Sequence, residues 1–302
     1  MKKVIIVIWT VIAIFLTVAL VNLIIFGDKI DISAFEISYK ERAIVFDKTY
    51  EDNIDNINLK WRSGDVNIYK NTEENIRVVQ KSSKELTEDE LVKVNIENGT
   101  IKIEEGNKKI RFFILGFGTL GTEVDVYLPE KQYNEIQVKL SSGQIVAEKI
   151  NCDKFICNLT SGDIEISELN SNSTDIDVTS GKIIVNKLET DSMDVNVMSG
   201  DTRIEGVAKN VNLKTTSGRI DFKDEILPEK LDVNVTSGDI KIDIPENEGF
   251  NVDYNITSGD FKSDFELMYS SNSKRNGMAK YKNGGNEFIF RVTSGQIKLN
   301  KK

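Results

Sequence analysis

Serine recurs beside glycine along this chain, and its hydroxyl is the first group on which chemistry could be expected. The Ser-Gly pair occurs nine times, with its glycines at Gly64, Gly143, Gly162, Gly181, Gly200, Gly218, Gly238, Gly259 and Gly295. A serine nucleophile needs a base, most often histidine. The chain has no histidine, and no lysine stands at a fixed offset to replace one. We therefore interpret these serines, Ser237 among them, as parts of a structural repeat.

The residue after each glycine is the second candidate, because carboxylates on neighbouring repeats can bind calcium. From the second corner to the eighth this residue runs Gln144, Asp163, Lys182, Asp201, Arg219, Asp239 and Asp260. Lys182 and Arg219 interrupt the carboxylates, so the pattern predicts a row in which opposite charges pair along an exposed edge. Asp239 and Asp260 are neighbouring like charges in sequence order, which leaves one weak calcium site there as an alternative.

Cys152 and Cys157 are the only cysteines, five positions apart. A disulfide across so short a loop is geometrically possible, but no framework of paired cysteines suggests one. The repeat places Cys157 at an inward position, and a free cysteine behaves there as a small hydrophobic side chain. The prediction is a buried free thiol. With neither serine, carboxylate nor thiol chemistry favoured, we expect no catalytic, cofactor or metal site and no cofactor.

The spacing of the Ser-Gly glycines is close to constant. From Gly143 to Gly259 the steps are 19, 19, 19, 18, 20 and 21 residues. The step to Gly295 is 36 residues, close to two periods, and the step from Gly64 to Gly143 is 79 residues, close to four. Such regularity is typical of a repeat architecture, and it predicts about a dozen coils.

The flanks of each corner alternate between apolar and polar residues, so each unit reads as strand, turn, strand. Glycine at the turn indicates a positive φ, and the serine before it can hydrogen-bond along the edge. A unit of this size cannot bury its apolar face alone, but stacked units can. The chain is therefore predicted to be all-β, a parallel β-solenoid of roughly 19-residue coils over residues 41–302, most regular over 134–263. A hairpin meander and a sandwich are the alternatives.

Other segments fit this register less well. Residues 57–70 fit it fully, and residues 94–105 fit it with Asn98-Gly99 in place of Ser-Gly. Residues 87–93 read as a short helix or loop insertion, and the apolar stretch 112–118 must be covered by the fold or meet a partner. Residues 267–287 read as an irregular excursion. The last coil, 288–302, ends in lysines that suit a solvent-facing cap at an exposed sheet end.

Composition narrows the class of partner. The chain has 302 residues, 39% of them hydrophobic, with a net charge of −9 and a pI near 4.9. An acidic surface repels phosphate backbones, so nucleic-acid binding is not expected.

The amino terminus predicts a membrane anchor. Val4–Phe26 is a run of 23 residues without a charge, and about 20 are needed to cross a bilayer as a helix. Lys2 and Lys3 precede it, which predicts a cytoplasmic tail at 1–3, an uncleaved transmembrane signal anchor at 4–26, a linker at 27–40 and an extracytoplasmic remainder. The alternative is a cleaved signal peptide, whose apolar region is normally shorter and ends at a small-x-small site.

The chain resembles the putative-adhesin family of β-strand-repeat proteins, a bacterial domain of unknown function with LiaG-like membrane-anchored envelope proteins among its members. The resemblance rests on the "TSGDI" corners, the "WRSGDVNIY" opening, the "VDVYLPE" segment and the N-terminal anchor, over residues 31–302. It implies a single-pass protein of the bacterial cell membrane with an extracytoplasmic solenoid, and it supplies no catalytic residues.

Three functions follow as hypotheses. The first is a binding or scaffold protein that is not an enzyme, with an envelope protein or cell-wall polymer as partner. The second is an accessory protein of an envelope-stress or antibiotic-response signalling system, which differs from the first only in its partner. The third is a polysaccharide-acting enzyme on a β-helix, which would need carboxylates clustered on one face. No such pair stands out, and the faces between the corners are where a function is expected.

Overall fold

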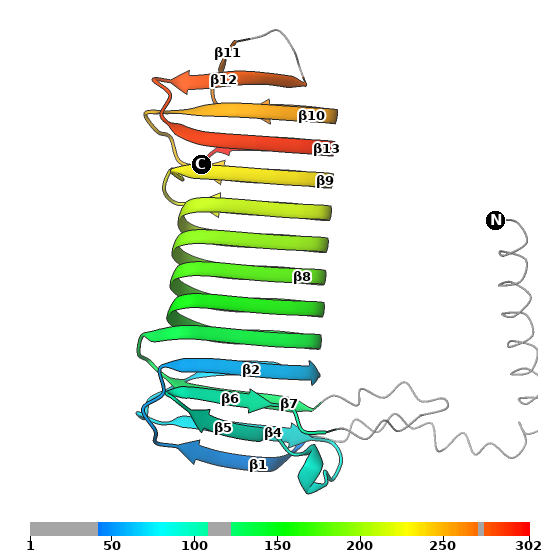
Figure 1. The fold of residues 1–302 in the computed structure, drawn as a ribbon. Helices are drawn as coiled ribbons and strands as arrows, with labels where there is room; N and C mark the ends of the chain where they lie inside the picture. The colour runs from blue at the N-terminus through cyan, green and yellow to red at the C-terminus, as the bar shows by residue number, and fades with distance from the viewer. Residues whose placement is uncertain (1–41, 108–121, 271–274) are drawn as a thin grey trace, which may run out of the picture. The chain divides into compact units, whose positions relative to one another are not determined.

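The computed structural model describes residues 42–107, 122–270 and 275–302, which form an all-β stack of coils (Figure 1). Its elements are β1 (Ala43–Tyr50), β2 (Asn56–Ser63), β3 (Val66–Asn71), β4 (Ile76–Ser82), the 3-10 turn η3 (Glu88–Glu90), β5 (Lys93–Glu97), β6 (Thr100–Glu104), β7 (Glu123–Pro129), β8 (Tyr133–Asp224), β9 (Lys230–Ile244), β10 (Gly249–Ser263), β11 (Met268–Tyr269), β12 (Asn276–Lys282) and β13 (Asn286–Lys301). No helix in these ranges is long and apolar enough to cross a membrane. The predicted segments 1–3, 4–26 and 27–40 lie outside the described residues.

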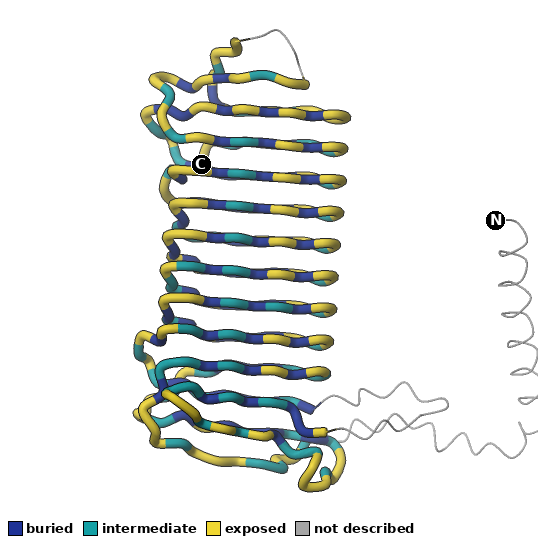
Figure 2. The backbone as a smooth tube through the Cα atoms, viewed as in Figure 1, coloured by how far each residue is buried: buried dark blue, intermediate teal, exposed yellow. Residues whose placement is uncertain are grey.

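The coils stack in parallel with equivalent residues aligned. The long element β8 winds through five Ser-Gly corners, and β9 continues the stack with Gly218 opposite Gly238. Apolar residues before and after each corner are buried and form one hydrophobic column, while the residues between them are exposed or half-buried, so buried and more exposed positions alternate along each coil in Figure 2. The prediction of an all-β, solenoid-like repeat is confirmed, since neither a hairpin meander nor a sandwich gives parallel pairing in this register.

A glycine column fixes the corners. The Ser-Gly glycines have φ between 118° and 150°, a region that L side chains rarely adopt. Space is the second constraint, because a Cβ on any of them would lie 1.6–1.9 Å from a backbone carbonyl oxygen of the adjacent coil. At Gly181 that oxygen belongs to Gly162, at 1.6 Å. The coils therefore approach each other closely along this line, and only glycine fits.

The aspartates after the glycines do not form the predicted ion pairs. Asp163 accepts a hydrogen bond from the backbone N–H of Lys182 at 3.0 Å, and Asp201 accepts one from Arg219 at 3.2 Å. Asp239 does the same for Gln296 at 3.2 Å. The prediction of opposite charges paired along the edge is wrong, because these three carboxylates instead bind a main-chain donor of the next coil.

The order of the coils in space differs from their order in sequence. β13 lies between β9 and β10 and pairs in parallel with both, so Gly295 stands between Gly238 and Gly259 (Figure 1). Gln296 therefore separates Asp239 from Asp260, and the calcium alternative loses the adjacency on which it rested. The predicted cap at 288–302 is also wrong, since this segment is internal and Phe288 and Phe290 are buried.

The two ends of the stack are antiparallel. β1 pairs with β4 and β4 with β7 at one end, while β12 pairs with β10 and the two-residue β11 at the other. The excursion predicted at 267–287 therefore contains two strands. The structure confirms a short helical turn within 87–93, at η3.

The segment around Asn98-Gly99 is a hairpin, not a coil. Asn98 and Gly99 have φ of 50° and 71°, which fits a two-residue turn of the type favoured between twisted antiparallel strands. β5 and β6 accordingly pair antiparallel, and the predicted corner is wrong. Gly64 and Gly143 lie on adjacent coils, so the interval of 79 residues does not hold the predicted periods. The nine Ser-Gly corners thus account for all corners of the column in the described residues, fewer than the predicted dozen.

Cys152 and Cys157 are free and buried in the column, as predicted for Cys157. Burial raises the pKa of the Cys157 thiol to about 12. Both thiols therefore act as apolar packing groups. The apolar stretch 112–118 lies outside the described residues.

Asp224, at the end of β8, is a fully buried carboxylate. It accepts hydrogen bonds from the backbone N–H groups of Ile226 at 3.0 Å and Ala208 at 3.3 Å. Burial opposes ionisation more strongly than these bonds favour it, which raises the pKa of Asp224 to about 7.

The glycine column gives a first prediction. Gly181→Ala is expected to lower the free energy of unfolding by about 3 kcal/mol or more, because the new methyl group meets the Gly162 carbonyl and φ is unfavourable. The control is Ser180→Ala at the exposed neighbouring position, which is expected to change the free energy of unfolding by less than about 0.5 kcal/mol. Urea unfolding followed by circular dichroism measures both; equal effects would contradict the steric account.

Asp224 gives a second prediction. Between pH 4 and 7 the Asp224 carboxyl group is protonated in the folded state but ionised in the unfolded state. The free energy of unfolding should therefore fall as the pH rises through that range. The free energy of unfolding should fall by about 4 kcal/mol in total across this range and should not change further above pH 8. Asp224→Asn should remove this fall, which urea unfolding at a series of pH values measures. An identical pH dependence in the variant would show that Asp224 is not the group responsible.

Candidate functional site

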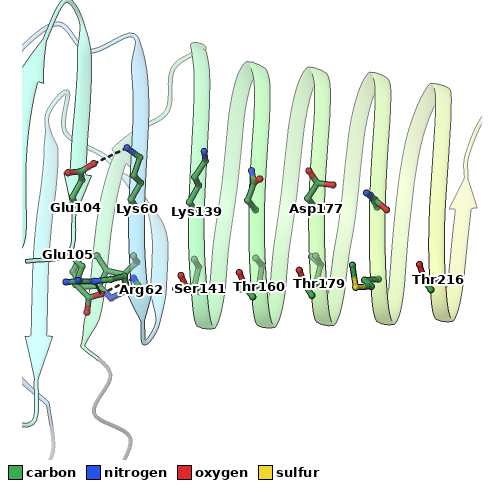
Figure 3. Close-up of a pocket in the computed structure, with 17 residues that line it drawn as sticks. Lys60, Arg62, Glu104, Glu105, Lys139, Ser141, Thr160, Asp177, Thr179 and Thr216 are labelled. Carbon is green, nitrogen blue, oxygen red and sulfur yellow. Dashed lines mark hydrogen bonds and ion pairs between the residues drawn. The ribbon is translucent and has the colours of Figure 1, made fainter. Parts of the chain in front are cut away.

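A shallow groove of about 630 Å³ crosses six consecutive coils on the face that precedes the corners (Figure 3). Five coil spacings of about 4.8 Å give it a length of about 24 Å along the stack. Two rows of outward side chains line it. The row two residues before each glycine consists of Arg62, Ser141, Thr160, Thr179, Met198 and Thr216. The row four residues before it consists of Lys60, Lys139, Asn158, Asp177 and Asn196.

The rows follow from strand geometry. Alternate residues of a strand face opposite sides, so the residues three before each glycine are buried and those two and four before it face outward. Trp61, Leu140, Leu159 and Val178 form the floor in this way. Stacking in register then repeats each outward side chain once per coil.

One end of the groove is held by a buried carboxylate. The Glu105 side chain is 1% exposed and accepts hydrogen bonds from the Arg62 backbone N–H at 2.9 Å and the Thr122 hydroxyl at 3.1 Å. The Arg62 guanidinium lies 3.4 Å from the same carboxylate. The Trp61 indole donates to the Thr122 carbonyl at 3.3 Å. These bonds fix the backbone of β2 and the orientation of Arg62.

The middle of the groove presents polar groups that the described residues leave unused. The Lys139 ammonium has no hydrogen bond or ion pair with any described residue, whereas Lys60 is paired with Glu104 at 3.0 Å. The hydroxyls of Thr160 and Thr179 likewise have no partner in the described part of the chain. A row of hydroxyls with one free cation can donate and accept hydrogen bonds along its length.

Three carboxylates lie in or beside the groove, Asp175 and Asp177 on its fourth coil and Asp194 on its fifth. Burial, then the nearby charges of Asp177 and Asp194, raise the pKa of Asp175. No group of three metal-ligating side chains is found in the ranges that the structure describes. Asp175, Asp177 and Asp194 together add negative charge to one side of the groove.

The sequence did not single out the groove residues. The corner serines and the aspartates after the glycines, Asp239 and Asp260 included, lie on the exposed edge and not in this groove. The sequence does contain one sign of the groove, because threonine or serine recurs two residues before the glycine at most corners. Lys60, Arg62 and Glu105 could not have been joined to the row without knowing that Gly64 stacks directly on Gly143.

One protein-family model matches most of the chain. The family model described as Toastrack DUF4097 matches residues 54–300. None of the curated proteins matches the chain significantly.

Three solved structures illustrate the likeness. A putative cell adhesion protein from Clostridium sporogenes has 14% identity and a TM-score of 0.31, over 85% of this chain and 99% of its own. A putative adhesin from Bacteroides fragilis has 13% identity and a TM-score of 0.42, over 86% and 98%. A putative lipid binding protein from Parabacteroides distasonis has 14% identity and a TM-score of 0.43, over 85% and 97%.

The buried carboxylate gives a third prediction. Glu105→Ala leaves the Thr122 hydroxyl and the Arg62 N–H without their acceptor, and should lower the free energy of unfolding by about 2 kcal/mol. Glu104→Ala removes only an exposed ion pair from the adjacent position and should cost less than about 0.5 kcal/mol. Urea unfolding measures the free energy of unfolding of both variants. If Glu105→Ala loses no more of it than Glu104→Ala, the buried carboxylate does not hold this end of the groove.

Proposed function

Since this chain belongs to the Toastrack DUF4097 family, we propose that it acts by binding, as a membrane-anchored scaffold on the outer side of a bacterial cell membrane. Three of the neighbouring structures are named as putative adhesins and one as a putative cell adhesion protein, which supports an adhesin-like role. The partner that we assign is a carbohydrate polymer of the cell wall.

The observation behind this proposal is the groove. Its length of about 24 Å suits an extended chain of several units and not a compact small molecule. Its lining repeats once per coil and consists mainly of hydroxyl and amide groups, which form hydrogen bonds with sugar hydroxyls in both directions. Thr160, Thr179 and Lys139 have no competing partner among the described residues, so binding would not have to break internal bonds.

The membrane attachment rests on the sequence. Val4–Phe26 is long enough to cross a bilayer core, and Lys2 and Lys3 favour a cytoplasmic start. In this arrangement the stack of coils, and with it the groove, lies on the outer side of the membrane. Binding, with no reaction, is the proposed role, since among the described residues no hydrogen bond joins a carboxylate to the hydroxyls of Ser141, Thr160, Thr179 or Thr216 in the groove.

The proposal is tested by co-sedimentation of the full chain, in detergent, with purified bacterial cell-wall sacculi. Thr160→Glu combined with Thr179→Glu places two carboxylates in the groove and should weaken retention about tenfold or more, a change of about 1.4 kcal/mol. A matched control uses the same two coils on the face after the corner, with Ser167→Glu and Asn186→Glu, which should leave retention unchanged.

Two results would overturn the proposal. Failure of the unmodified chain to sediment with sacculi would reject the assigned partner. An equal loss in the groove variant and the control variant would show that charge alone, and not the groove, governs retention.

A further inference from the structure

β13 fills a slot between two coils that follow one another in the chain. β9 and β10 are joined directly by residues 245–248, yet they do not pair with each other. Residues 287–301 pair with β9 and residues 286–299 pair with β10, parallel in both cases. The slot is therefore formed by one segment of the chain and filled by another that arrives after β12.

The fit of β13 in this slot is specific. Gly295 completes the glycine column, and a Cβ there would lie 1.7 Å from the Gly238 carbonyl oxygen. The Phe288 ring stacks on Phe250 with centroids 4.7 Å apart. Gln296 donates its backbone N–H to Asp239, which would otherwise face Asp260. A different strand would lose the register, the aromatic contact or the corner hydrogen bond.

The connection that delivers β13 is short and strained. It passes from β12, on one side of β10, to the slot on the other side within Asn283–Gly285. Lys282 has a φ of 43°, unusual for a residue with a side chain, and Gly284 and Gly285 have φ of 75° and 129°. Short hinges under strain favour exchange of the strand that follows them between copies of a chain.

The other contacts of β13 are equally available to a second copy. Glu246, in the loop that joins β9 to β10, binds both Lys301 of β13 and Lys282 of β12. These cations lower the pKa of Glu246 to about 2, so the contact is charged at neutral pH. Most groups that contact β13 lie in β9, in β10 or in this loop, and the rest lie directly before β9, at Pro228 and Glu229, or directly after β10, at Asp264. All of these residues precede the hinge in the chain.

We propose that the slot between β9 and β10 is a binding site for β13 of a second copy of this chain, so that two copies join by reciprocal exchange of residues 286–301. The exchanged strand makes the same bonds in either copy, and only the hinge differs. Extension of the hinge across to the second copy relieves the positive φ at Lys282. This interaction is independent of the groove and of its proposed ligand.

The test uses two differently tagged full-length copies expressed together. One carries Ser237→Cys in β9 and the other carries Ser294→Cys in β13, positions that are opposite and exposed. Parallel neighbours about 4.8 Å apart lie within the Cα range of disulfides. Exchange is expected to give an oxidised heterodimer on a non-reducing gel. The same two substitutions in one copy should give a fast-migrating internal disulfide, which shows that this pair can be oxidised.

The matched control places Ser161→Cys in one copy and Ser180→Cys in the other. These serines occupy the same corner position on adjacent coils within β8, which no hinge separates. They should give heterodimer only by collision. The proposal would be overturned if the internal disulfide forms but the pair in β9 and β13 gives no more heterodimer than this control.

The length of the hinge provides a second measurement. Deletion of Gly284 and Gly285 should raise the dimeric fraction several-fold in light scattering, because the shortened connection no longer crosses β10 within one copy. Insertion of six Gly and Ser residues after Gly285 should lower it. A dimeric fraction that responds to neither change would contradict exchange through this hinge.

Discussion

The contact between each corner glycine and the carbonyl of the next coil is the constraint on which the whole stack depends. Two requirements coincide there, a positive φ and the absence of a Cβ, and a carbonyl oxygen 1.6–1.9 Å from the position of a Cβ makes the second requirement absolute. Because every coil meets the same condition at the same place, the corner aligns all other residues. The buried column, the exposed edge and the groove each keep one position per coil for that reason.

The groove is a consequence of this alignment. A single coil supplies only one hydroxyl and one amide or charged side chain to it, as Thr160 and Asn158 show. Register multiplies them into a lining about 24 Å long without any further element. The end near Arg62 is different, since the buried carboxylate of Glu105 directly follows the β5–β6 hairpin and has no equivalent in the Ser-Gly repeat. The repeat thus provides the length of the site, and a segment outside the repeat provides its end.

Much of the fold could be predicted from the sequence, because its dominant signals are local. Glycine spacing and apolar alternation identify the corners and the inward residues, Cys157 included. Two features could not be read in this way. Asn98-Gly99 has the spacing of a corner but the conformation of a hairpin turn, and only its partner strand decides between them. The groove residues near Lys60 required knowledge of which coil follows Gly64, which depends on contacts between distant segments.

The place of β13 shows why a repeat hides the order of its own coils. "VTSGDIKI" and "VTSGQIKL" differ in their inward residues only at Ile242 and Leu299, so the buried positions around the corner accept either strand beside β10. The exposed edge does not. In spatial order the residue after the glycine runs Asp65, Gln144, Asp163, Lys182, Asp201, Arg219, Asp239, Gln296 and Asp260, with no two aspartates adjacent. Sequence order would place Asp239 against Asp260, two carboxylates one coil apart, and their repulsion favours the insertion of Gln296 between them. At the corner the polar edge therefore distinguishes one coil from another, and before the corner the stacking of Phe288 on Phe250 adds a core contact specific to β13.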